Sequence, residues 1–492
     1  MADNLLGSPR FSFGAAGKNF KLAFLVLVIF DLLSFWAHQF SFLNWLLFGL
    51  ICLITLFLAV SKLEYAFYVL LLELFVGSKG YLLFGEIGDG RISLRVGIFI
   101  AIFLGWLIQL LMGKGREFFA RKEWLLPHLV LAVFFVLGLV SGVLNNSLGE
   151  LFFDANGWLY FLLVPVFFSV IRERKILDNI FSMLLAAGGF LSLKTLAVYL
   201  IFVHQIWPFQ LPVIYRWLRE SGVGEITFLS ENYVRVFFQA QFYVLAGFLA
   251  AIVLLALDPK GKVNQRWLWG LIFLQSLALI ISLSRSFWLG ALAGFALLLV
   301  LLFFKYHWKF VSLLKGFLAL AAMLVLNLGF LSAVTLNFYP EVLTGRFVDP
   351  ASEAASASRL NQLKPLWQAI QNDWFLGAGF GKEVSYLTRD PRLVRQLSGG
   401  YYTTYAFEWG YLDIWLKIGL LGLLAYFWLM VKIIRQSFRA EALGAILMIV
   451  LAAVAVTHVF SPYLNHPLGI GLIMLFSATL AFLEKFYGTK TG

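Results

Sequence analysis

The sequence predicts an all-α polytopic membrane protein with about 12–14 transmembrane helices and one large, partly helical extracytoplasmic loop. The first observation is composition, since 61% of the 492 residues are hydrophobic and only 13% are charged. A soluble domain of this length needs more charged residues to cover its surface. The second is the supply of 52 phenylalanines and 16 tryptophans, which suits lipid-facing spans with aromatic belts.

Apolar runs of roughly 20 residues, the length of one membrane span, recur along the chain. The third run is short and contains Glu73. Residues 1–21 are polar and lack the apolar core and cleavage site of a removable signal peptide, so we expect the first span to be retained. The expected spans are centred near Ile29, Ile51, Val69, Ile102, Phe134, Leu163, Leu191, Ala246, Leu274, Leu297, Met323, Leu424, Ile449 and Met474.

These runs divide the chain into membrane and non-membrane parts. A loop as long as residues 335–403 is usually functional in a chain whose other connections are short. An amphipathic helix is expected inside it, because apolar residues recur there at helical spacing, at Leu360, Leu363, Leu366, Trp367 and Ile370. The expected parts are a cytoplasmic tail (1–20), transmembrane helices one to eleven (21–334), the extracytoplasmic loop domain (335–403), transmembrane helices twelve to fourteen (404–487) and a second cytoplasmic tail (488–492).

The formal charge of +12 has a topological explanation. Lysines and arginines concentrate in the loops on the side of the N-terminus, as the positive-inside rule requires of cytoplasmic loops. Both termini are therefore expected in the cytoplasm, and we expect the lipid bilayer, not nucleic acid, as a partner. The single cysteine, Cys52, builds neither a disulfide framework nor a thiolate metal site.

Arg285 is the most informative single residue. It lies between two long apolar runs, with Ser284 and Ser286 beside it and no other charge nearby. A guanidinium at the end of a membrane span is costly unless it serves an anionic group or a wet cavity. Because its planar fork of donors suits phosphate oxygens, the residue indicates a membrane protein that binds a phosphate.

Three more charged residues are expected on the same outer face: Arg235 at the start of the eighth span, Arg359 at the start of the loop helix, and Glu408 where the loop re-enters the membrane. Each has a simpler reading, since interfacial arginines often reach for lipid headgroups, Arg359 suits a solvated loop, and Glu408 suits a partner of one arginine. As a set, the arginines fit a diphosphate leaving group and the carboxylate fits a general base.

Several segments in this order resemble the O-antigen ligase and polymerase family over residues 235–427. Any one of them is a weak signal, because glycine-rich apolar strings are common in membrane helices. They are Ser282-Leu-Ser-Arg-Ser286, Ser358-Arg-Leu-Asn-Gln-Leu-Lys-Pro-Leu-Trp367, Phe375-Leu-Gly-Ala-Gly-Phe-Gly381 and Gly410-Tyr-Leu-Asp-Ile-Trp-Leu-Lys-Ile-Gly-Leu-Leu-Gly422.

The resemblance implies a bacterial glycosyltransferase acting on the outer face of the inner (plasma) membrane. Its donor is a glycan linked to undecaprenyl diphosphate, and its acceptor is a hydroxyl of a lipid core, a growing glycan or a protein. The reaction inverts the anomeric centre and uses no metal and no cofactor. The family's paired diphosphate-binding arginines match Arg235 and Arg285, and its loop arginine matches Arg359.

The chain departs from the family pattern at two points. Family ligases usually carry a His-Asn pair just before the Tyr-Leu that opens the re-entering helix, where this chain has Glu408 and Trp409. The expected base is thus Glu408, a carboxylate, with His458 as the alternative base. The glycine and Pro-Asn often found after the first arginine are also absent after Arg235.

Two alternatives to a ligase stay open at this point. A polysaccharide polymerase of the same family shares the donor and differs in the acceptor. A lipid-linked glycan flippase is a rival from another class, but such transporters often show internal repeats and charges around a midplane cavity. The sequence halves show no convincing repeat, and the midspan charges are few: Asp31, Glu73, Lys194 and Lys417.

Overall fold

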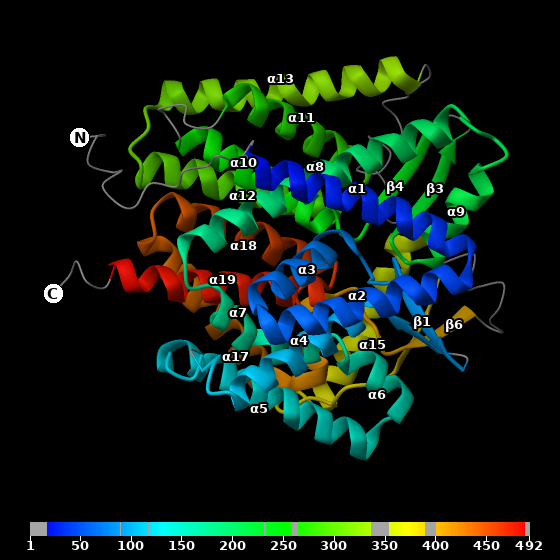
Figure 1. Ribbon diagram of the computed structural model, residues 1–492, viewed down its shortest axis with the longest axis vertical. Helices are drawn as coiled ribbons and strands as arrows, with labels where there is room; N and C mark the ends of the chain where they lie inside the picture. Colours follow the sequence, from blue (N-terminus) through cyan, green and yellow to red (C-terminus); the bar gives the residue numbers. More distant parts are fainter. Residues whose placement is uncertain are drawn as a thin grey trace. The chain divides into compact units, whose positions relative to one another are not determined.

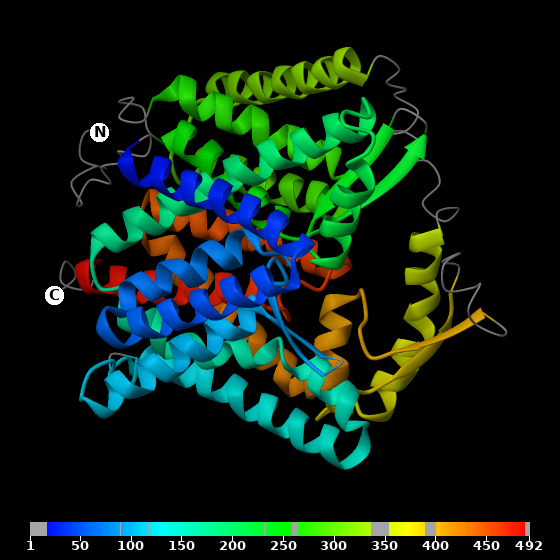
Figure 2. The same cartoon turned by 45° about the vertical axis from the view of Figure 1, so that its right-hand side comes forward.

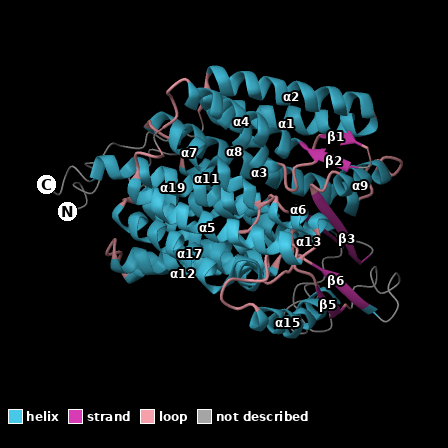
Figure 3. Ribbon diagram, turned by 90° about the horizontal axis from the view of Figure 1, so that it is seen from below, coloured by secondary structure: helices cyan, strands magenta, loops and turns pink. Residues whose placement is uncertain are grey.

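The computed structural model describes residues 17–88, 90–116, 118–230, 233–257, 264–335, 354–388 and 400–487. The fold is 76% helical, with very little sheet, and the predicted all-α membrane class is confirmed. Figures 1 and 3 show long helices with a few short strands between them. Of the expected tails, residues 1–16 and 488–492 lie outside the described residues, as do 336–353 and 389–399 of the expected loop domain.

Ten helices in the described ranges are long and apolar enough to cross a membrane. A bent pair adds an eleventh span if it crosses as one, and two shorter apolar helices, α10 (Gln241–Leu257) and α11 (Gln265–Ile281), accompany them. The pair is α6 (Leu148–Ala155) and the following helical run through η2 (Trp158–Leu163) and α7 (Val164–Val170), bent by 45°. The ten are α1 (Lys18–Gln39), α2 (Ser41–Ser61), α4 (Leu94–Leu111), α5 (Lys122–Asn145), α8 (Arg174–Val203), α12 (Arg285–Phe304), α13 (Phe310–Thr335), α17 (Gly410–Arg439), α18 (Ala442–Phe460) and α19 (Pro467–Tyr487).

The third expected span is a shorter helix than the sequence suggested. Helix α3 (Leu63–Val76) has 14 residues, or roughly 21 Å of length where a bilayer core needs about 30 Å. Its carboxylate Glu73 is buried and bonded on both oxygens by Arg95, from Nε at 2.9 Å and Nη2 at 3.0 Å. The helix therefore packs inside the protein, where the arginine compensates its charge.

The chain forms two compact units. The first takes in Met1–Gly115, Val166–Ser284 and Leu298–Leu336, and the second Arg116–Pro165, Arg285–Leu297 and Asn337–Gly492. Helix α12 runs from one into the other.

In the first unit, helix α8 packs against α1, α3, α10 and α11. The buried Lys194 of α8 pairs with Asp31 of α1 at 2.5 Å. Two antiparallel hairpins also belong to this unit, together with the short helix α9 (Leu211–Glu220). The hairpins are β1 (Phe84–Ile87) with β2 (Gly90–Ser93), and β3 (Gly224–Ser230) with β4 (Tyr233–Phe238).

The second unit contains α5, α17, α18 and α19 together with the described part of the large loop. That part consists of α15 (Ala354–Asn372) and the antiparallel hairpin of β5 (Val384–Leu387) and β6 (Tyr401–Thr404). Figure 2 shows α15, in yellow, running beside this hairpin. Of the expected apolar side of the helix, Leu366 and Ile370 are buried against Val384, Phe407 and Leu416, whereas Leu360 and Trp367 are exposed. The described part of the loop thus packs on the start of α17.

Candidate active site

The loop helix and the turn that leads back into the helices meet through an ion pair. Residues 405–409, here called the re-entering turn, carry Glu408, whose Oε2 lies against Nε of Arg359 on α15. Trp409 Nε1 donates to the Arg359 carbonyl at 2.9 Å, and the amide of Glu408 lies 3.4 Å from Oε1 of Gln362. The Arg359 and Glu408 side chains stay 35% and 45% exposed, so both are accessible to a substrate.

We expected Arg359 at the start of the loop helix. That prediction is wrong, because α15 begins five residues earlier, at Ala354. The simpler reading of Glu408, as the partner of one of the arginines, is what the structure shows, with Arg359 as that partner. The residue predicted to be the base and one of the residues predicted to bind phosphate therefore form an ion pair with each other.

The glycine-rich string after α15, residues 374–381, forms a tight turn against a break in α17. Gly377, Gly379 and Gly381 have φ of +84°, +85° and +77°, and Gly419 in the middle of α17 has φ 71° and ψ 177°. Such values are accessible to glycine at little cost. We call residues 374–381 the glycine turn.

Backbone hydrogen bonds fill the break. Leu420 N–H and the Leu416 carbonyl would pair in an unbroken helix. Here Leu420 N–H donates to the Trp374 carbonyl at 2.9 Å, and the Leu416 carbonyl accepts from Ala378 N–H at 2.7 Å. The glycine turn thus satisfies polar groups that the kink would leave without partners.

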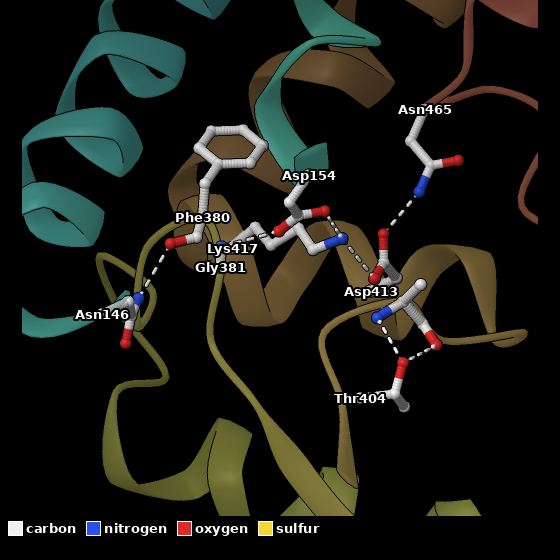
Figure 4. Close-up of polar contacts among 9 residues, drawn as sticks. Asn146, Asp154, Phe380, Gly381, Thr404, Asp413, Lys417 and Asn465 are labelled. Carbon is white, nitrogen blue, oxygen red and sulfur yellow. Dashed lines mark hydrogen bonds and ion pairs between the residues drawn. The ribbon is translucent and has the colours of Figure 1, made fainter. Parts of the chain in front are cut away.

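A buried charge cluster lies next to this break (Figure 4). Lys417 Nζ is 2.5 Å from Oδ1 of Asp154 on α6 and 2.6 Å from Oδ1 of Asp413, one turn earlier on α17. Asp154 also accepts the amide of Gly381 at 2.8 Å, and Asn465 donates to Asp413. From the sequence, Lys417 was noted only as a midspan charge, and neither Asp154 nor Asp413 was predicted to be its partner. An i, i+4 spacing of Asp413 and Lys417 was the one available signal.

The re-entering turn also carries a tyrosine that faces this acidic region. Burial raises the pKa of the Tyr405 phenol, and the carboxylates of Glu150 and Asp154 raise it further. Tyr405 therefore keeps its proton at neutral pH.

Arg285 is the first residue of α12, where the exposed amides of a helix N-terminus favour anions. The next residue fixes this helix end in the second unit. The Ser286 carbonyl accepts from Thr457 Oγ1 at 3.2 Å, and Ser461 Oγ donates to Ser286 Oγ at 3.0 Å. Arg285 thus sits on a well-anchored helix start.

His458, the predicted alternative base, lies beside the start of α17. It is fully buried, and its Nδ1 accepts the amide of Leu464 at 3.1 Å. Its ring stacks edge-on against Tyr411 at 4.7 Å between ring centres, and Gly410 lies so close that no side chain would fit there.

Arg235 lies in the first unit, whereas the other four predicted site residues lie in the second. The sequence analysis placed Arg235 at the start of a span, but the structure places it in strand β4, before α10 begins at Gln241. Alternating β-branched and aromatic residues explain the strand. Its Nε donates to the Ser282 carbonyl at 2.9 Å, three residues before Arg285 in the chain.

Comparison with protein families now bears on these residues. Residues 270–427 match the family model described as O-antigen ligase. The chain is similar to the O-antigen ligase family over this stretch, which is here called the O-antigen ligase domain. The match supports the resemblance stated from the sequence over residues 270–427, and the domain holds Arg285, Arg359, Glu408 and Lys417 but not Arg235 or His458. No curated protein matches the chain.

The O-antigen ligase domain spans the ion pair, the glycine turn and the break in α17. The helices and the domain together make this a multi-pass membrane protein. Within the described ranges, no group of three or more histidines, cysteines or carboxylates is arranged to hold a metal ion.

Proposed function

We propose that this protein is a membrane glycosyltransferase of the O-antigen ligase type. It transfers a glycan from undecaprenyl diphosphate to an acceptor hydroxyl on the outer face of the bacterial inner membrane, without a metal ion and with inversion. The observation that carries this proposal is the accessible Arg359–Glu408 pair inside the O-antigen ligase domain. It puts a phosphate-binding group and a proton acceptor side by side.

In this proposal the arginines bind the donor. Arg285 and Arg359, both in the second unit, neutralise the diphosphate oxygens and stabilise the charge that develops as the leaving group departs. A guanidinium fork contacts two oxygens at once, which a lysine ammonium does not do with the same geometry.

Glu408 acts on the acceptor. Its carboxylate takes the proton of the attacking hydroxyl, whose oxygen forms the new bond to the anomeric carbon while the bond from that carbon to the phosphate oxygen breaks. Undecaprenyl diphosphate leaves with the electron pair of that bond. Because Arg359 pairs with Glu408, a diphosphate that binds Arg359 competes with the carboxylate and frees it to act as the base.

A polymerase of the same family would use the same donor and another acceptor. The O-antigen ligase match favours either enzyme over a flippase. The fully buried His458, already bonded at Nδ1, supports Glu408 as the base.

The test is release of undecaprenyl diphosphate from a purified undecaprenyl-diphosphate glycan, without added metal and with lipid-core, glycan and protein acceptors in parallel. Wild type releases it with one acceptor class, and Arg285→Ala does not. Arg435→Ala, an exposed arginine towards the far end of α17, is the matched control and keeps the wild-type rate. Failure of wild type with every acceptor, or full activity of Arg285→Ala, would overturn the proposal.

A further inference from the structure

The Asp154–Lys417–Asp413 cluster, here called the buried triad, ties together four separate segments. Its three side chains are each no more than 5% exposed. Asp154 comes from α6, and its Oδ2 holds the amide of Gly381 in the glycine turn at 2.8 Å. Asp413 and Lys417 come from the first two turns of α17, and Asp413 accepts from Asn465 in the loop before α19.

The triad is a costly way to hold a fold together. Charges buried in a membrane protein lose their hydration, and apolar side chains of similar volume often stabilise as well or better. What buried ion pairs supply in some proteins is a single, defined arrangement of the segments that they join. The triad is therefore better explained by the arrangement of the segments that it fixes than by stability.

The segments that the triad joins are those that carry the Arg359–Glu408 pair. Glu408 lies two residues before α17 begins at Gly410, so the position of the first turns of α17 sets the position of its backbone. Arg359 lies on α15, which continues into the glycine turn that Asp154 holds at Gly381. One anchor thus controls both sides of the pair.

We infer that Asp154, Asp413 and Lys417 are positioning residues that hold the loop helix and the re-entering turn in register, and so set the Arg359–Glu408 geometry. This inference rests on the proposed function, in which those two residues contact the substrates. The triad itself contacts neither donor nor acceptor.

The first test measures geometry without any assay of transfer. In a Cys52→Ser background, which removes the only cysteine, Gln362→Cys and Glu408→Cys are introduced and joined by a short thiol-specific cross-linker. The control pair is Ser385→Cys with Thr403→Cys, partners across the β5–β6 hairpin whose spacing its own ladder sets.

The triad is then neutralised as Asp154→Asn, Asp413→Asn and Lys417→Met together, which removes all three charges and leaves no unpaired one. We expect the cross-linking yield of the 362/408 pair to fall several-fold and that of the hairpin pair to stay unchanged. An unchanged yield at both pairs would overturn the inference. If the triple variant does not fold, Asp154→Asn alone decides the question in the same way.

A second measurement separates this inference from the proposed function. In the transferase assay, Asp154→Asn lowers kcat by roughly 10–100-fold, the cost of a small misplacement of reacting groups, and leaves the donor KM near the wild-type value. Glu150→Gln, one turn earlier on α6, is the control and changes neither. If Asp154→Asn lowers kcat/KM only by raising KM, with kcat unchanged, the result counts against a positioning role. If wild type transfers nothing, the proposed function fails, and the cross-linking result still judges the triad.

Discussion

Arg359 and Glu408 are 49 residues apart in the sequence and form an ion pair between the loop helix and the re-entering turn. The pair stays partly open to solvent, so breaking it costs little, since exposed ion pairs contribute about 0–1 kcal/mol. A doubly charged diphosphate offers Arg359 a stronger partner than one carboxylate does. The ion pair between Arg359 and Glu408 is therefore weak enough for a substrate to replace it.

The first prediction concerns the base. Glu408→Gln keeps a polar side chain of the same size but removes the proton acceptor, so we expect the transfer rate to fall by about 10²–10⁴-fold. Single-turnover release of undecaprenyl diphosphate measures the transfer rate. Equilibrium binding of the donor shows whether the variant still binds its substrate. Donor binding is expected to stay the same or tighten, because Arg359 loses its carboxylate competitor. Wild-type turnover in this variant would move the base elsewhere, with His458 next to test.

The second prediction concerns the shape of the phosphate clamp. Arg285→Lys keeps the positive charge and loses the planar fork of donors, so it should restore little of the activity that Arg285→Ala loses. Loss of one charge-assisted hydrogen bond costs about 1.5–3 kcal/mol, and we therefore expect kcat/KM to fall by roughly 10–100-fold. Arg439→Lys, an exposed residue at the end of α17, is the matched exchange and should leave kcat/KM unchanged. Equal activity of both lysine variants would mean that Arg285 acts only as a point charge.

The sequence predicted the all-α membrane class because most spans are decided locally, by some twenty apolar residues in a row. It expected about 12–14 spans, whereas ten helices in the described ranges, or eleven with the bent pair, are long and apolar enough. The helix of the large loop was likewise predicted from spacing, and α15 buries Leu366 and Ile370 as expected. The hairpins were not predicted, since a strand such as β4 is too short and apolar to distinguish from the start of a helix.

The partners of buried charges were beyond the sequence for a different reason. Lys417 and Asp154 are 263 residues apart, and Glu73 and Arg95 are 22 apart. Each pair joins two different helices, α6 with α17 and α3 with α4, so no pattern within one helix links the two residues. The sequence marked Glu73 and Lys417 as unusual, and only the packing of helices showed what compensates them.

A third prediction tests one such compensation without reference to function. Glu73→Gln leaves the buried guanidinium of Arg95 without its counter-charge, and we expect a loss of about 3–5 kcal/mol in the free energy of unfolding. The control is Glu86→Gln, whose carboxylate pairs with Arg91 at the surface, both side chains being near 45% exposed. That exchange should cost about 0–1 kcal/mol. Thermal unfolding in detergent compares them, and similar melting temperatures would mean that Arg95 finds another partner.

The last prediction concerns the break in α17. Gly419 has φ 71°, and a Cβ added there would lie 2.2 Å from the carbonyl oxygen of Phe375 in the glycine turn. Gly419→Ala therefore combines a strained backbone with an overlap that only movement of the turn relieves, at a cost of about 2–5 kcal/mol. Gly149→Ala in α6, where the nearest atom is 3.8 Å away, should instead be neutral or slightly stabilising.

Thermal unfolding and transfer rates of the two alanine variants are compared. The comparison distinguishes a role of the glycine turn in stability from a role in positioning α15. If the glycine turn serves only stability, activity falls in proportion to the folded fraction. If it positions α15, as the hydrogen bonds from Leu420 N–H to Trp374 and from Ala378 N–H to Leu416 indicate, transfer by the folded Gly419→Ala protein falls well beyond that fraction. Equal stability of the two variants would contradict the prediction, because it would show that the glycine turn moves away from the added methyl group at no cost.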